Sequence, residues 1–596
     1  MVERQRRRLS TGGLAPLARE AVAAFQAGAL DRALALTDRI LERHPREAAI
    51  LELAATIHRR LGRFAEAEGL LRRAIAAEPD RAGFHLALGK LCRRQGRAEE
   101  AIAALTRALE LAPGHAGAGV ALGQLLLELN LPGRAGTLLE GVVAAGGDHP
   151  RLFFHLGEAL LATGSVAPGV EALRRAFAGS PGDAELAADC AEALLGASAL
   201  EVAGELLAKA REGDPRHPRL AFIQARWERR RGESGAAREG LEGLLRSSLA
   251  DPLAARVHNE LGLLLDALGE TEAAFDHFRR GNDLGARLDR EAGIDPESYP
   301  ALLAAVREVV EAAPAAAGGL RDVGGGVGEV AVEDPPLPWR LAFLVGFPRS
   351  GTTLLDQILD AHPAISVIEE RPLLAALEGR LPLLTGREYP GALGEITTSR
   401  RQHLRELYTR VAAEYLQGSP QLLVDKFPLN IRLLPLAAKL FPEARVVVAL
   451  RHPADVVLSG FMQHFAPNVA MTHLHALATG ARLYAGVMGL WEAEAPRLGL
   501  PWHRIRYEDL VAAPEAEARA LLAFLGVDWD AAILDFDRHA RARGTIRTPS
   551  AAQVTRKLHG EARYRWRRYH RHLAPVLPLL QPFIDRFGYG EEVWDK

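Results

Sequence analysis

The stretch that decides the fold is Leu341–Pro363, which reads LAFLVGFPRSGTTLLDQILDAHP. It opens with an apolar run, Leu341–Val345, whose length suits a buried strand. A turn over residues 346–351 follows, and leucine and isoleucine then recur at helical spacing as far as His362-Pro363. A strand, a tight turn and a helix in this order aim backbone N–H groups and a helix N-terminus at one point, where an anion such as phosphate can bind.

The glycines of this turn are spaced as in the phosphate-binding loop of nucleotide hydrolases, with four residues between Gly346 and Gly351. That loop continues with a lysine and a Ser or Thr, whereas this chain has Thr352-Thr353. Arg349, inside the turn, is the cation that the loop itself supplies. We therefore expect a phosphate-binding loop without ATP or GTP hydrolysis; a purely structural turn is the alternative.

The overall composition excludes several classes of protein. With 48% hydrophobic and 25% charged residues and a net charge of −2, nothing indicates nucleic acid or an anionic membrane as a partner. No apolar run approaches the roughly 20 residues of a transmembrane helix, and no signal-peptide pattern follows the basic start. Two cysteines, Cys92 and Cys190, are too few for a disulfide framework or a four-ligand zinc site. We expect a cytoplasmic protein with both cysteines in its core.

The N-terminal half repeats every 34 residues. Turn residues at this spacing are Gly28, Gly62, Gly96, Asn130, Gly164, Ser198 and Gly232, with Gly269 three residues late. Alanines follow these turns, and prolines close the units at the same spacing. The pattern resembles the tetratricopeptide repeat, and about eight units fit between Leu14 and Arg287. One helix pair cannot bury its own apolar face, so the units are expected to stack into a solenoid.

The domain organisation follows from these patterns. We expect a disordered basic N-terminus over 1–13 and an all-α solenoid with a helical tail over 14–313. Residues 314–338, rich in Gly and Pro, indicate a flexible linker before a second domain over 339–596. The concave face of the solenoid is expected to hold an acceptor protein or peptide; a scaffold or a dimerisation arm is the alternative.

Further apolar runs in the C-terminal half predict strands that alternate with helices. They cover residues 365–368, 421–424 and 444–450, with a last short strand from Ile505 that leads into a helix. This alternation predicts a mostly parallel sheet with both faces covered. Ligands bind beyond the carboxyl ends of such strands, where Glu369-Glu370, Lys426 and Arg451 follow. A carboxylate there would serve as a general base, and the spacing alone does not choose between the two glutamates.

Three segments together resemble a known family: Phe347–Thr353, Asp360–Pro363 and Glu369-Glu370. They resemble the sulfotransferases that use 3′-phosphoadenosine 5′-phosphosulfate (PAPS), above all the protein-tyrosine sulfotransferases and bacterial proteins that join tetratricopeptide repeats to that domain. The resemblance covers residues 340–590 or so. It implies an α/β P-loop-like three-layer domain with a parallel sheet, in which a sulfuryl group moves from PAPS to an acceptor hydroxyl and leaves 3′-phosphoadenosine 5′-phosphate (PAP).

The resemblance also implies roles for individual residues. The implied cofactor-binding residues are Arg349, Ser350, Gly351, Thr352, Thr353, Arg451, Ser459, Tyr507, Ser550 and Arg556. Among them the loop binds the 5′-phosphosulfate, Arg451 and Ser459 hold the 3′-phosphate, and Ser550 and Arg556 belong to a late loop over the nucleotide. The implied catalytic residues are Glu370 as the base, Lys426 on the leaving phosphate, and Arg349.

Several points stay open at this level. Pro372 stands where tyrosine-sulfating relatives carry an arginine, so a protein tyrosine is the leading acceptor and a saccharide or small-molecule hydroxyl is the alternative. A P-loop-type nucleotide kinase and a repeat scaffold with an inactive C-terminal half are the rival functions. No metal-ligand spacing is visible, so we expect no metal. A homodimer is compatible with the sequence.

Overall fold

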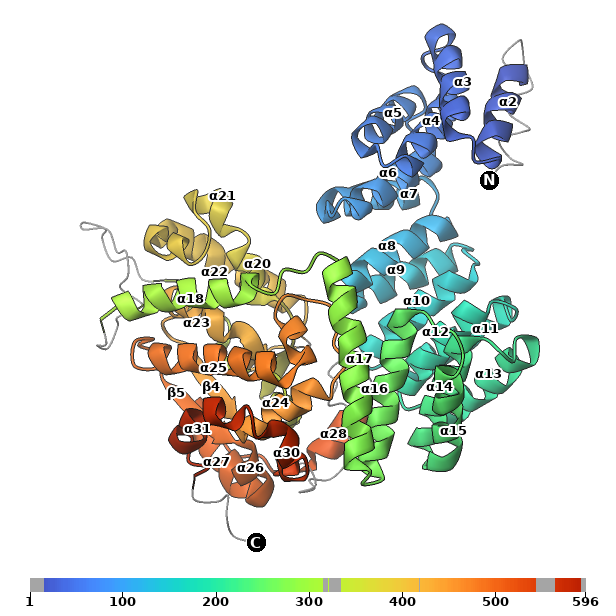
Figure 1. Ribbon diagram of the computed structural model, residues 1–596. Coiled ribbons are helices and arrows are strands. Elements are labelled where there is room, and N and C mark those ends of the chain that lie inside the picture. The colour runs from blue at the N-terminus through green and yellow to red at the C-terminus, as the bar shows by residue number, and fades with distance from the viewer. Residues whose placement is uncertain (1–14, 315–319, 321–333, 417, 543–562, 591–596) are drawn as a thin grey trace. The chain divides into compact units, whose positions relative to one another are not determined.

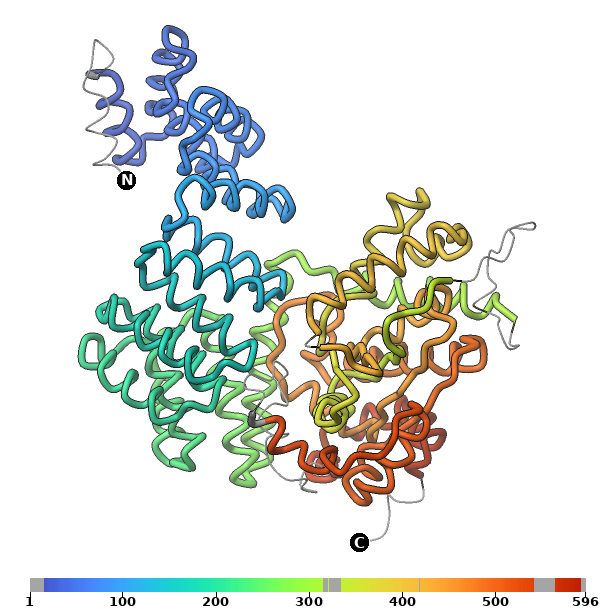
Figure 2. Tube along the Cα trace, turned by 180° about the vertical axis from the view of Figure 1, so that it is seen from behind, coloured from blue at the N-terminus to red at the C-terminus, as the bar shows by residue number. Residues whose placement is uncertain are grey.

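The structure is a computed structural model that describes residues 15–314, 320, 334–416, 418–542 and 563–590 (Figures 1 and 2). The chain divides into two compact units, Met1–Asp214 and Pro215–Lys596. The described part of the first unit is entirely helical. The second combines further helices with a parallel sheet. The expected disordered stretch over 1–13 lies outside the described residues.

The first unit consists of consecutive antiparallel helix pairs. Its helices are α2 (Ala15–Gln26), α3 (Leu30–Arg43), α4 (Ala48–Arg60), α5 (Phe64–Ala77), α6 (Ala82–Arg94), α7 (Ala98–Leu111), α8 (Ala116–Glu128), α9 (Pro132–Ala144), α10 (Pro150–Ala162), α11 (Val166–Gly179), α12 (Ala184–Gly196) and α13 (Leu200–Gly213). Both cysteines, Cys92 and Cys190, are buried in this helical core, as predicted.

The turn residues anticipated from the 34-residue spacing share one backbone conformation. All eight of them, from Gly28 to Gly269, have positive φ angles between 57° and 84°. This left-handed region favours glycine. Asn130 and Ser198, the two non-glycine members, nevertheless adopt it. The repeat phase predicted from sequence is therefore confirmed, including the two units that depart most from the pattern.

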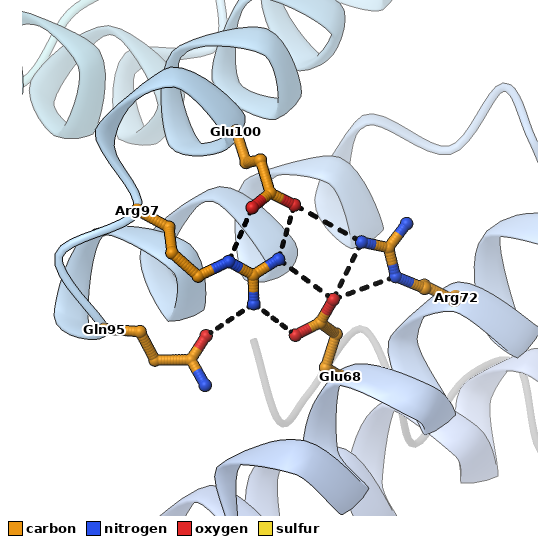
Figure 3. Close-up of polar contacts among 5 residues, drawn as sticks. All are labelled: Glu68, Arg72, Gln95, Arg97 and Glu100. Carbon is orange, nitrogen blue, oxygen red and sulfur yellow. Dashed lines mark hydrogen bonds and ion pairs between the residues drawn. The ribbon is translucent and has the colours of Figure 1, made fainter. Parts of the chain in front are cut away.

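An ion-pair network links neighbouring repeats in the first unit (Figure 3). Arg97 contacts Glu100 on α7 and reaches Glu68 on α5 at 2.5 Å. Arg72 adds a second contact to Glu68 at 2.7 Å. The hydrogen bond from Arg97, with a smaller contribution from Arg72, lowers the pKa of Glu68 to about 2. The network ties one helix pair to the next, which is the interface on which solenoid stability depends.

The second unit begins with the last repeats. These are α14 (Pro218–Arg230), α15 (Ser234–Leu245), α16 (Asp251–Ala267) and α17 (Thr271–Glu291), followed by α18 (Ser298–Ala312), the expected helical tail. Helix α17 packs on the segment after α24, and α18 packs on α25. The division between the compact units therefore falls within the repeat array, at residue 214, and not at the expected linker. Most of that linker, 315–319 and 321–333, lies outside the described residues.

Five strands form one sheet in the described part of the chain, all of them parallel. They are β1 (Arg340–Gly346), β2 (Ile365–Glu369), β3 (Leu422–Lys426), β4 (Arg445–Leu450) and β5 (Trp502–Arg506), in the order β2–β3–β1–β4–β5. Four lie where the apolar runs predict them. The fifth begins earlier than predicted and ends at Arg506, because this edge strand is partly exposed and lacks a continuous apolar run.

Helices cover both faces of the sheet. Those in the sheet-containing part of the chain are α19 (Thr352–Asp360), α20 (Leu373–Glu378), α21 (Leu381–Thr385), α22 (Thr398–Ala413), α23 (Leu434–Leu440), α24 (Pro453–Phe461), α25 (Leu477–Glu494), α26 (Tyr507–Ala512), α27 (Pro514–Leu525), α28 (Phe536–Ala542), α30 (His570–Leu573) and α31 (Leu577–Arg586). Leu344 on β1 packs with α19 and α27, whereas Phe343 points to the other face and contacts Phe441. The predicted class, an α/β parallel-sheet domain after an all-helical solenoid, is confirmed.

Candidate functional site

The loop after β1 has the backbone of an anion cradle. Gly351 precedes α19 with φ 96°, and Arg349 has φ 75°, a conformation that costs a non-glycine residue roughly 1–3 kcal/mol and clusters at functional sites. Thr352 and Thr353 open α19, where the first N–H groups have no partner within the helix. Ser350 Oγ is buried and has no hydrogen-bond partner among the described residues. These features suit a phosphate or sulfate oxygen.

Two arginines meet beside this loop. Arg349 Nε donates to Ser459 Oγ at 3.0 Å, and Arg451 Nη1 donates to the Arg349 carbonyl at 3.4 Å. Burial lowers the pKa of Arg349 to about 10, and the positive charges of Arg451 and Arg565 act in the same direction. Two neighbouring positive charges repel each other, and an anion bound between them relieves this repulsion. This end of the site therefore favours a phosphate.

Tyr507 closes the same end of the site. It opens α26 directly after β5, and the Arg451 guanidinium lies 4.9 Å from the centre of its ring. A Cβ on Gly351 would come within 2.9 Å of the ring carbon Cδ2. Gly351 is therefore needed for its backbone angle and for this close approach. The structure thus brings Arg349, Gly351, Arg451 and Tyr507 into one cluster from three strand ends.

Lys426, at the end of β3, is fully buried among carboxylates. Its Nζ lies 2.9 Å from Glu370, 3.5 Å from Glu369 and 3.6 Å from Asp356. Burial lowers the pKa of Lys426, but the three carboxylates outweigh burial and raise it above its ordinary value. The lysine is consequently held as a cation.

The two adjacent glutamates have different surroundings. Glu370 lines a cavity, and its side chain is 37% exposed. The side chain of Glu369 is only 7% exposed, and its Oε1 has no hydrogen-bond partner in the described part of the chain. Glu370 also has φ 48°, and its N–H donates to the Lys426 carbonyl at 2.7 Å. This geometry favours Glu370 as the carboxylate that a bound hydroxyl would meet.

The cavity next to Glu370 has a volume of about 520 Å³. Arg349, Gly351, Thr352 and Thr353 form the end of the cavity next to the loop after β1. Apolar side chains, including Phe427, Leu433, Phe465 and Val469, dominate the remainder of its wall. A cavity with one cationic end, one carboxylate and an apolar wall can hold an anionic donor next to an organic hydroxyl.

Sequence reasoning missed part of this wall. Tyr299 comes from α18, and its buried hydroxyl has no hydrogen-bond partner among the described residues. Arg432, also on the wall, forms an ion pair with Glu378 at 2.6 Å. Segment 465–471 contributes as well. No motif marks these residues, and only the fold brings them to the cavity. The predicted Ser550 and Arg556 lie outside the described residues.

Two parts of the chain match models of known protein families. Residues 342–531 match the family model described as "Sulfotransferase family". Residues 18–80, 52–116, 92–153 and 224–286 match tetratricopeptide-repeat models. The chain combines a sulfotransferase-family domain with tetratricopeptide repeats. The matched range of the sulfotransferase-family model contains all lining residues of the cavity except Tyr299, which precedes it.

Three curated relatives each match less than half of this chain. An uncharacterized protein of Aquifex aeolicus is 27% identical over 41% of this chain and 32% of its own length. The nodulation protein NoeE of Sinorhizobium fredii is 31% identical over 32% of this chain and 51% of its own length. Protein-tyrosine sulfotransferase 1 of Danio rerio is 28% identical over 42% of this chain and 72% of its own length. The chain thus spans only a third to a half of the length of the first two.

The described residues lack two kinds of feature. None of the helices there is long and apolar enough to cross a membrane. The same residues contain no cluster of three or more His, Cys, Asp or Glu side chains suited to a metal ion.

Proposed function

We propose that the chain is a PAPS-dependent sulfotransferase that transfers a sulfuryl group to an acceptor hydroxyl. The observation that supports it best is the cavity that joins the arginine-bearing loop to Glu370 at the carboxyl ends of parallel strands. We further propose that the protein acts in the cytoplasm, alone or as a homodimer. The acceptor would be a protein or peptide held by the repeats, which commonly mediate protein interactions.

The donor fits the cationic end of the site. Ser350, Thr352 and Thr353 would bind the 5′-phosphosulfate together with the N-terminus of α19. Arg451 and Ser459 would hold the 3′-phosphate, and Tyr507 would pack on the nucleotide. The buried Ser350 Oγ and the paired guanidinium groups support this assignment, because each gains a partner when an anion binds.

The carboxylate end of the site would handle the proton. When bound, PAPS supplies an activated sulfuryl group: the acceptor oxygen bonds to sulfur as the bond from sulfur to the 5′-phosphate oxygen breaks, and that oxygen keeps the electron pair. Glu370 would take the hydroxyl proton. Lys426 would stabilise the charge on the leaving phosphate, and its 2.9 Å contact with Glu370 couples the two groups.

The apolar wall of the cavity indicates which class of acceptor would fit. Phe427, Phe465 and Val469 favour the ring of a tyrosine or another phenol, whereas a saccharide would need more polar partners. The relatives named protein-tyrosine sulfotransferase support the same acceptor. A saccharide hydroxyl remains the second candidate.

Incubation with ³⁵S-labelled PAPS tests this proposal. Label from the donor is expected in tyrosine-containing peptide rather than in oligosaccharide when both are offered. Calorimetry with PAP and with ADP plus magnesium tests the kinase alternative, and preferential binding of ADP would overturn the sulfotransferase proposal. A chain that binds PAP but transfers no label to either acceptor, or to the hydroxyls of a cell lysate, would instead be an inactive scaffold.

Substitution of Arg451 tests the donor end. Arg451→Ala is expected to weaken PAP binding about 10- to 100-fold, because a charged hydrogen-bond partner of a phosphate is lost. Calorimetry measures the change. Arg519→Ala removes an exposed arginine on α27 that pairs with Glu515, and it should leave PAP affinity unchanged. Equal affinities in the two variants would remove Arg451 from the donor site.

Substitution of Tyr299 tests the acceptor wall. Tyr299→Phe removes a buried hydroxyl that has no hydrogen-bond partner within the described ranges, so the melting temperature should stay the same or rise. The KM for the labelled acceptor is nevertheless expected to rise about fivefold, because one hydrogen bond to that acceptor is lost. Tyr389→Phe is the matched control: its hydroxyl donates to the Arg432 carbonyl, so stability should fall. A Tyr299 variant with unchanged KM would contradict a role in acceptor binding.

A further inference from the structure

The end of α24 is capped by side chains from the last repeat. Met462 N–H and Gln463 N–H bond to the carbonyls of Leu458 and Gly460. The next carbonyl, that of Phe461, accepts a hydrogen bond from Nδ2 of Asn282 on α17, with 2.8 Å between nitrogen and oxygen. The carbonyls that end a helix need such partners from outside, and the partner of the Phe461 carbonyl lies 179 positions earlier in the chain.

A second amide continues this contact. Nδ2 of Asn259, on α16, donates to the Met462 carbonyl at 2.9 Å. Asn282 is buried, and both asparagines act on consecutive carbonyls where the chain leaves α24. Removal of either amide leaves a carbonyl that must find water or another donor.

Helix α17 also holds the far end of the segment that follows α24, at His475. Ring nitrogens of His475 lie 3.0 Å from Asp289 Oδ2 and 3.4 Å from Asn282 Oδ1. Gly285 makes room for this ring, since a Cβ there would lie 2.6 Å from a His475 ring carbon. Segment 462–475 is therefore fixed at both ends by α16 and α17.

Aromatic packing joins this contact to the C-terminal part of the chain. Phe275 on α17 stacks on Phe461 with ring centres 5.1 Å apart, and on His572 at 3.7 Å. Asp266 on α16 accepts a hydrogen bond from the Tyr569 hydroxyl at 2.7 Å and forms an ion pair with Arg568 at 3.1 Å. Figure 1 shows α16 and α17 beside α24 and α30. The last repeat thus packs on the sheet-containing part through both apolar and charged contacts.

The held segment belongs to the site. Phe465, Val469 and Met471 lie on the cavity wall, and Ser459 lies two residues before the capped carbonyl of Phe461. Within the segment, Asn468 caps Ala470 and Met471 N–H groups. What fixes its two ends therefore fixes the acceptor side of the cavity.

We propose that the last repeat, α16 and α17, positions the acceptor-side wall of the catalytic cavity, with Asn259, Asn282 and His475 as the positioning contacts. The repeat is then part of the enzyme and not a detachable arm. This inference rests on the proposed function for the meaning of the cavity, but the ordering of segment 462–475 by the repeat can be tested without it.

Hydrogen–deuterium exchange of the ligand-free full chain tests the positioning directly. In Asn259→Ala/Asn282→Ala, amides of 462–475 are expected to exchange about tenfold faster, while the strands β1 and β4 remain protected. Asp276→Ala, which removes an exposed ion-pair partner on the same helix, should change neither. If the double variant does not fold, Asn259→Ala alone replaces it. Unchanged exchange in 462–475, or faster exchange spread over the whole sheet, would overturn the proposal.

Kinetics and calorimetry then test the link to the acceptor. The double variant is expected to raise the acceptor KM about tenfold and to change the PAP dissociation constant less than threefold. An unchanged KM with accelerated exchange would overturn the proposal. Failure of the wild-type chain to bind PAP would overturn the proposed function instead, and the exchange experiment would still decide whether the repeat orders the segment.

Discussion

Glu370→Gln lowers turnover by about 10²–10⁴ while PAP affinity stays within twofold, if Glu370 is the general base. Glutamine keeps the shape of the side chain and one oxygen that can accept a hydrogen bond from Lys426 Nζ. In the wild type, this nitrogen lies 2.9 Å from Glu370 Oε1. It cannot take a proton from the acceptor hydroxyl. The expected loss is therefore in kcat, measured as transfer of label from ³⁵S-labelled PAPS under saturating donor.

Glu369→Gln is the matched control for this prediction. Glu369 is the neighbouring residue, contacts the same lysine at 3.5 Å and is almost completely buried, so it does not line the cavity. Its substitution should lower kcat less than tenfold. If instead the Glu369 variant loses turnover and the Glu370 variant keeps it, the base has been assigned to the wrong carboxylate.

The fold could be predicted because its signals are local. Strand β4 is an unbroken apolar run from Val446 to Leu450 with three consecutive valines, and the loop before α19 combines two glycines with a strand and a helix. The repeat turns could be predicted from spacing even where Asn130 and Ser198 replace glycine, because the packing of stacked helix pairs imposes the left-handed turn. The edge strand β5 was predicted less well because one side of it faces solvent.

The site could be predicted in part. The residues that follow the strand ends converge because all strands are parallel, and Gly346 pairs with Ala449 while Leu344 pairs with Lys426. The contact between Arg349 and Ser459 depends on β4 lying next to β1, which no local pattern gives. For the same reason the sequence did not indicate that α18 reaches the cavity or that α17 holds segment 462–475. A repeat pattern reports which face of a helix is buried, but not what covers it.

Lys426→Met has the second large effect that we expect. The lysine stabilises developing charge on the leaving phosphate in the proposed reaction, and loss of one such donor lowers kcat about 10²- to 10³-fold. Lys439→Met is the matched control, since Lys439 is also buried but lies on α23 and away from the cavity wall. Both variants are expected to lose stability, and only the first should lose turnover. Equal kcat values in the two variants would contradict a catalytic role.

The stability of the Lys426 variant should also depend on pH in a characteristic way. Without Lys426, Asp356, Glu369 and Glu370 lose the cation that contacts all three. Asp356 and Glu369 are buried, and crowded carboxylates without a cation favour their protonated forms. The folded variant then binds more protons than the unfolded chain, so its stability falls as pH rises and recovers as pH is lowered. Melting curves between pH 8 and pH 5 should therefore show Lys426→Met approaching the wild type at the acid end. A constant difference across that range would show that Lys426 does not neutralise the carboxylates, and the same measurement on Lys439→Met should show no such convergence.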